Sequence, residues 1–62
     1  MVITAKALKD LSNGNGDAEK GMICDVLKVW LNHEIGDIYV EIKFRANDLE
    51  MITSISNIEI IK

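Results

Sequence analysis

The sequence predicts a small α+β domain, in which a short N-terminal helix and one long amphipathic helix pack on an antiparallel β-hairpin or three-stranded meander. Three observations support this fold class. Apolar residues recur at helical spacing between residues 17 and 35, apolar and polar residues alternate between 37 and 45, and segments rich in Gly, Asn and Asp separate the patterns. Since the chain has 62 residues, we expect a single domain spanning 1–62.

The first element is predicted to be a short helix over residues 4–12. Thr4 can accept a hydrogen bond from a free N–H of the first turn, and Ile3 and Leu8 then have the spacing of a hydrophobic staple. The Ala, Lys and Leu residues of this segment favour helix. An alternative interpretation places residues 1–8 in a strand, which gives the order β-α-β-β.

A glycine-rich segment follows, and then the long helix. Residues 13–17, Asn-Gly-Asn-Gly-Asp, are typical of a turn and are predicted to be a hinge between two helices. Residues 17–35 are predicted to be helical, with Gly36 ending the helix. The apolar residues with helical spacing are Met22, Ile23, Val26, Leu27, Trp30 and Leu31. Their arc covers about 240°, which predicts a helix buried on more than one side.

The next segment, 37–45, is predicted to be a strand with one packed and one solvated face. The residues predicted to face the core are Ile38, Val40, Ile42 and Phe44, and those predicted to face solvent are Tyr39, Glu41, Lys43 and Arg45.

A turn at 46–48 leads to a second extended run over residues 49–55. The alternation changes phase at Ser56-Asn57, which predicts a bulge or a tight turn before a third short strand containing Ile58 and Ile60.

Composition limits the function classes. The chain has 7 basic and 10 acidic side chains, one His and one Cys, so it cannot form an internal disulfide or a cysteine-based zinc site. His33 and Glu34 begin like a zinc-binding H-E-x-x-H helix, but Asp37 stands where the second His is required. We therefore expect no catalytic residues, no cofactor and no metal. We also expect a cytoplasmic protein, because one unpaired Cys suits a reducing compartment and no apolar run is long enough for a membrane span.

These features predict a non-enzymatic protein–protein interaction module: a small regulator, inhibitor or accessory subunit that acts by stoichiometric binding. The bias toward Ile, Lys and Asn, with no Pro and one Arg, suits a phage or mobile-element protein. The wide apolar arc predicts a homo-oligomer. The residues expected to mediate self-association are Ile23, Leu27, Leu31 and Ile35, and those expected to contact another protein are Tyr39, Lys43, Arg45, Glu34 and His33.

An alternative function is a nucleic-acid-associated module that uses the solvated strand face. Tyr39, Lys43 and Arg45 supply one aromatic ring and two cations there. The net charge of −3 makes nucleic acid an unlikely partner, because such binding depends on neutralising phosphates.

Overall fold

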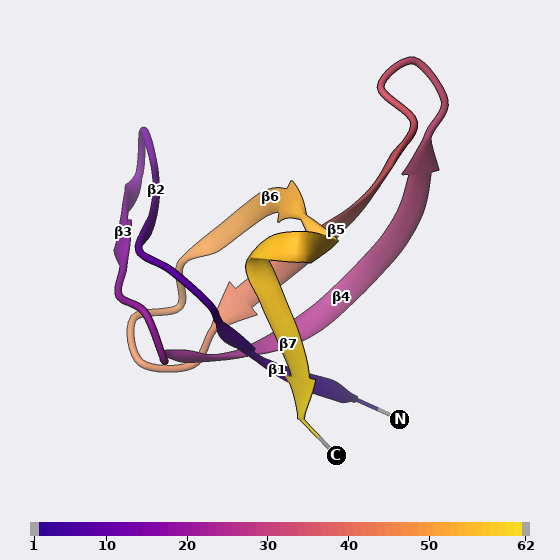
Figure 1. Ribbon diagram of the computed structural model, residues 1–62. Helices are drawn as coiled ribbons and strands as arrows, with labels where there is room; N and C mark the ends of the chain where they lie inside the picture. Colours follow the sequence, from indigo (N-terminus) through magenta and orange to yellow (C-terminus); the bar gives the residue numbers. More distant parts are fainter. Residues whose placement is uncertain (1, 62) are drawn as a thin grey trace.

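The computed structural model describes residues 2–61 and consists almost entirely of β-strands (Figure 1). The elements are β1 (Ile3–Ala7), β2 (Leu11–Asn13), β3 (Gly16–Ala18), β4 (Ile23–Asn32), β5 (Asp37–Phe44), β6 (Glu50–Ser54), the 3-10 helix η1 (Ile55–Asn57) and β7 (Ile58–Ile61). Five strands form one antiparallel sheet in the order β6-β5-β4-β1-β7. β2 and β3 form a separate two-stranded hairpin.

The predicted α+β class is wrong, because no helix of seven or more residues occurs among residues 2–61. The segment predicted as the long helix, residues 17–35, contains the end of β3, a turn, all of β4 and part of the β4–β5 turn. Among residues 2–61, no helix is long and apolar enough to cross a membrane.

The helical spacing in residues 22–31 arises from a strand with apolar residues on both faces and a bulge in its middle. The register with β5 shifts between Val26 and Lys28. The core-facing positions are consequently 24 and 26 before the bulge and 29 and 31 after it, so the period of two is broken. The β-branched residues Ile23, Val26 and Val29 favour the extended conformation.

The predicted helix over residues 4–12 is also wrong, because β1 occupies its first half. The alternative that places residues 1–8 in a strand agrees with β1 over Ile3–Ala7, although Met1 lies outside the described residues, and it is wrong about the helix after it. Thr4 is not a helix cap, since its Oγ1 accepts a hydrogen bond from Arg45 Nη2 at 3.3 Å, and Leu8 is exposed. Ala5 and Ala7 are fully buried where β1 lies between β4 and β7.

The two glycine-containing breaks are hairpin turns. The 13–17 segment is not a hinge between helices: it closes the β2–β3 hairpin, where Asn15 N donates to Asn13 Oδ1 at 2.9 Å. Gly36 ends no helix; it has a φ of 75° and lies in the turn between β4 and β5, where its N–H donates to Asn32 O at 2.8 Å.

The strands predicted for the C-terminal half are present, but the three-stranded meander is wrong, because β7 pairs with β1 at the opposite edge of the sheet and not with β6. Ile38, predicted to face the core, is 40 % exposed. β5 spans Asp37–Phe44, and Val40, Ile42 and Phe44 are fully buried. The predicted change of phase at residues 56–57 is η1, which is capped by the Ser54 hydroxyl accepting from Ser56 N. β7 follows directly and buries Ile58.

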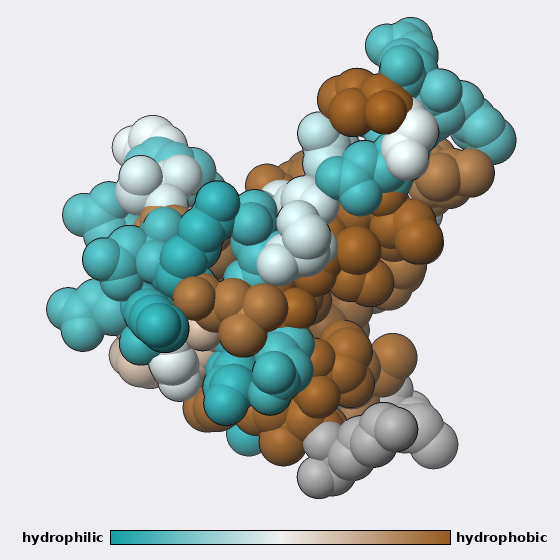
Figure 2. Space-filling view, viewed as in Figure 1, coloured by the Kyte–Doolittle hydropathy of each residue, from teal (hydrophilic) through white to brown (hydrophobic). Residues whose placement is uncertain are grey.

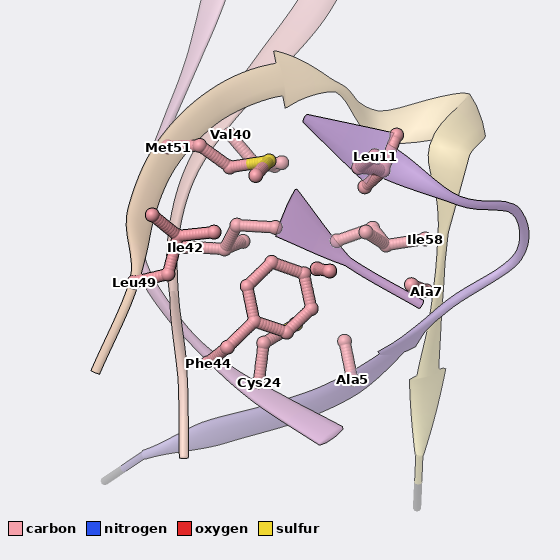
Figure 3. Close-up of a cluster of buried hydrophobic side chains, with 11 residues drawn as sticks. Ala5, Ala7, Leu11, Cys24, Val40, Ile42, Phe44, Leu49, Met51 and Ile58 are labelled. Carbon is pink, nitrogen blue, oxygen red and sulfur yellow. The ribbon is translucent and has the colours of Figure 1, made fainter. Parts of the chain in front are cut away.

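The core lies inside the bend of the sheet, with Phe44 at its centre (Figure 3). Each of the seven strands contributes at least one side chain to the core, and Leu49, just before β6, contributes another. The buried apolar residues are Ala5, Ala7, Leu11, Ala18, Cys24, Val40, Ile42, Phe44, Leu49, Met51 and Ile58.

Candidate interaction surface

The β4–β5 hairpin extends beyond the core. We call residues 27–39 the arm; they comprise β4 after its bulge, the turn and the start of β5, and they project from the rest of the molecule (Figure 1). β1 pairs with β4 only as far as Val26. β4 in the arm therefore has β5 on one side and, among residues 2–61, no strand paired along the other side.

The inner face of the arm continues the core-facing side of the sheet but is not covered. Val29 pairs with the buried Val40, and Leu31 pairs with Ile38, so these side chains share the face that carries the core. Val29, Leu31 and Ile38 nevertheless have 52 %, 51 % and 40 % of their surface exposed. Figure 2 shows hydrophobic surface along this hairpin. Ile35, in the turn, adds a further exposed apolar side chain.

The outer face of the arm carries an aromatic pair and a cation. Trp30 and Tyr39 are opposite each other across β4 and β5, with ring centroids 6.3 Å apart in an edge-to-face arrangement. Lys28 Nζ lies 5.7 Å from the centroid of the Trp30 ring, within the range of a cation–π contact. Trp30, which the sequence placed within an apolar helix face, is therefore half-buried on the outer side of the sheet.

Near the base of the outer face, an ion pair and a hydrogen bond link the residue after β5 to β4 and β1. Arg45 donates to Asp25 Oδ1 from Nε at 3.1 Å and from Nη2 at 2.6 Å, and Nη2 also reaches Thr4. The hydrogen bond from Arg45 lowers the pKa of Asp25, and the same contact raises the pKa of Arg45. The guanidinium of Arg45 thus already has hydrogen-bond partners within the chain, Asp25 and Thr4.

The single Cys belongs to the core. Cys24 has no exposed surface, and burial, followed by the nearby Asp25 charge, raises the pKa of its thiol. A buried thiol with a raised pKa is a poor nucleophile, so Cys24 acts as a small apolar side chain.

The five residues predicted to contact another protein do not form one patch. His33 and Glu34 are in the turn at the tip of the arm, and Tyr39 lies further down on its outer face. Lys43 is nearer the base, where it is paired in register with Asp25 and Glu50, and Arg45 follows β5.

Three of the four residues predicted for self-association lie on the arm. Leu27, at the bulge, is 50 % exposed, and Leu31 and Ile35 are also exposed. Ile23 is at the other end of β4, where it pairs with Lys6, because an extended strand separates positions that a helix would align. Sequence reasoning missed Val29 and Ile38. The signal for Val29 was the alternation of apolar residues at 27, 29 and 31.

Comparisons with known proteins add no relative. The chain matches no protein-family model, no curated protein and no solved structure. The function proposed below is therefore argued from the geometry and chemistry of the arm.

Proposed function

We propose that the chain is a small, cytosolic, non-enzymatic protein–protein interaction module that self-associates and acts by stoichiometric binding, as a regulator, inhibitor or accessory subunit. The observation that supports this proposal is the uncovered inner face of the arm. There, Val29, Leu31 and Ile38 extend the core side of the sheet into solvent.

Single exposed apolar residues are common on monomers, whereas a contiguous group marks an interaction site. The arm residues are contiguous because they occupy paired positions of two adjacent strands. The accessible surface of the whole chain is 4290 Å². A compact monomer of this mass is expected to expose about 4,000 Å². The slightly larger surface agrees with an arm that projects from the rest of the molecule.

The charge arrangement favours a protein partner over a nucleic acid. Two of the cations proposed for phosphate binding face acidic neighbours, since Arg45 is hydrogen-bonded to Asp25 and Lys43 is paired in register with Asp25 and Glu50. Nucleic-acid binding requires cations that are available to neutralise phosphates. The outer face therefore gives little support to the alternative function of a nucleic-acid-associated module.

Replacing Leu31 with glutamate is expected to weaken self-association strongly. The wild-type molar mass in solution, measured by size exclusion with light scattering, should rise with concentration from 6.9 kDa toward twice that value. Leu31→Glu should weaken the association at least about tenfold, because it places a charge within the apolar contact.

The matched control is Ile52→Glu, since Ile52 is 59 % exposed but lies on β6, outside the arm. It should associate like the wild-type chain, and far-UV circular dichroism should show both variants folded. A wild-type chain that stays monomeric at every concentration measured would contradict the proposed self-association. Equal weakening of the association by both variants would contradict its location on the arm.

A further inference from the structure

The turn of the β2–β3 hairpin contains two asparagines, and each is followed directly by glycine. The sequence there is Asn13-Gly14-Asn15-Gly16. Asparagine followed by glycine is especially prone to deamidation, because glycine has no Cβ atom to shield its backbone nitrogen from the preceding side chain. The hairpin lies away from the arm (Figure 1), so this chemistry can be studied apart from the proposed self-association.

The two asparagine side chains differ in their contacts. Asn13 Nδ2 donates a hydrogen bond to the backbone oxygen of Glu50 at 3.1 Å, and Asn13 Oδ1 accepts one from Asn15 N at 2.9 Å. Both polar atoms of the Asn13 side chain are therefore held, one of them by a different strand. Asn15 is exposed, and none of the hydrogen bonds among residues 2–61 involves its side chain. The Asn15 side chain is thus free to rotate toward the next backbone nitrogen.

We propose that Asn15 is a site of spontaneous deamidation in the folded protein and that Asn13 is protected by its contacts. The backbone nitrogen of Gly16 loses its proton and attacks Cγ of Asn15, which forms a succinimide ring. The bond between Cγ and Nδ2 breaks, and Nδ2 takes up a proton and leaves as ammonia. Water then opens the ring at one of its two carbonyls and gives aspartate or isoaspartate. Either product adds a negative charge to the turn, and isoaspartate also adds a carbon to its backbone.

The attacking nitrogen belongs to the last residue pair of the hairpin. Gly16 is paired with Asn13 beside the turn, and three residue pairs in all join β2 to β3. The end of so short a ladder opens more readily than strands that pass through the core. The Gly16 nitrogen therefore becomes available without unfolding of the domain. This opening does not require the hydrogen bond from Asn13 to Glu50 to break, because that bond is made to β6.

Packing against the core favours glycine at position 16. A Cβ atom on Gly16 would lie 3.3 Å from Cδ1 of Leu49, which is tighter than an ordinary van der Waals contact, and Leu49 is a core residue. A side chain at this position would shield the backbone nitrogen from Asn15, but the close approach of Leu49 disfavours one. Gly14 differs, because a Cβ atom there would meet nothing within 4 Å. The packing thus keeps glycine after the asparagine whose side chain is not held.

Mass spectrometry of aged protein tests the site. The folded chain is incubated at mildly alkaline pH and sampled over time, and each sample is digested with trypsin, which leaves both asparagines in one peptide, residues 10–20. Fragmentation of that peptide shows which residue has been modified. We expect Asn15 to react at least about tenfold faster than Asn13, because the Asn13 side chain must first lose two hydrogen bonds.

The same incubation in concentrated urea is the first control. Unfolding removes the contacts of Asn13, so the two asparagines, each followed by glycine, should then react at similar rates. The matched variant is Gly14→Ala, for which the structure has open space. It should slow the reaction of Asn13 in urea and leave the reaction of Asn15 in the folded chain unchanged. Far-UV circular dichroism checks that this variant is folded.

Three results would overturn this inference. In the folded chain, Asn13 could react as fast as Asn15 or faster. Neither asparagine could react in the folded chain while both react in urea, which would mean that the hairpin protects both. Deamidation of the folded chain could also slow in Gly14→Ala, which would assign the reaction to Asn13. The oligomeric state is measured on fresh protein, so none of these results bears on the proposed function.

Discussion

Replacing Phe44 with alanine is expected to remove about half or more of the domain's free energy of unfolding. Phe44 has no exposed surface, and its ring is at the centre of the buried cluster (Figure 3). Truncating a buried Phe to Ala costs about 3–5 kcal/mol, because it removes apolar contacts and leaves a cavity. A chain of 62 residues is expected to have a free energy of unfolding of only about 3–9 kcal/mol. Urea denaturation followed by circular dichroism measures the loss.

The control for Phe44→Ala is Ile52→Ala, at a β6 position where the side chain is 59 % exposed. Surface substitutions usually change the free energy of unfolding by less than about 0.5 kcal/mol. If Phe44→Ala were no more destabilising than Ile52→Ala, the assigned core would be wrong.

Replacing Ala5 with leucine is expected to be the next most damaging change. Ala5 has no exposed surface and is paired with Cys24 on β4 and Ile60 on β7, so the additional carbons have no free space. Overpacking of this kind costs about 1–3 kcal/mol. The shift in the urea midpoint at constant slope measures this cost.

Ile3→Leu is the matched control for Ala5→Leu. Ile3 is on the same strand and the same face, two residues away, but is 43 % exposed. Its substitution should leave the urea midpoint almost unchanged. Equal stability of Ala5→Leu and the wild-type chain would mean that β1 does not pack against the core.

The sequence was sufficient to predict β5 and the extended segments after it, but not the pairing of β7 with β1. In β5 one face is buried and the other is solvated, so apolar and polar residues alternate without interruption. The turn between β6 and β7 was also predictable, because η1 shifts the phase of the alternation between Met51 and Ile58.

The first half of the chain was not predictable by the same method. β4 has apolar residues on both faces and a bulge between Val26 and Lys28, so a period of two is absent. In β1, Ala5 and Ala7 have a high helix propensity, but both are fully buried where β1 lies between β4 and β7. The Asn-Gly-Asn-Gly sequence is a strong hairpin signal and was the best indication of an all-β chain.

The candidate surface was predicted in part. Leu27, Leu31 and Ile35 were selected for self-association as one side of a helix, and they are exposed together on the arm for a different reason. The unpaired edge of β4 could not be predicted, because it depends on where β1 ends relative to β4.

The most direct test of this account is a measurement of backbone chemical shifts for residues 17–35 by nuclear magnetic resonance. The fold, the arm and its open edge all require β4 to be extended over Ile23–Asn32. We predict strand-type shifts for these residues, with a cross-strand contact between Trp30 and Tyr39. Continuous helix-type shifts over residues 17–35 would contradict the fold and the interaction surface together.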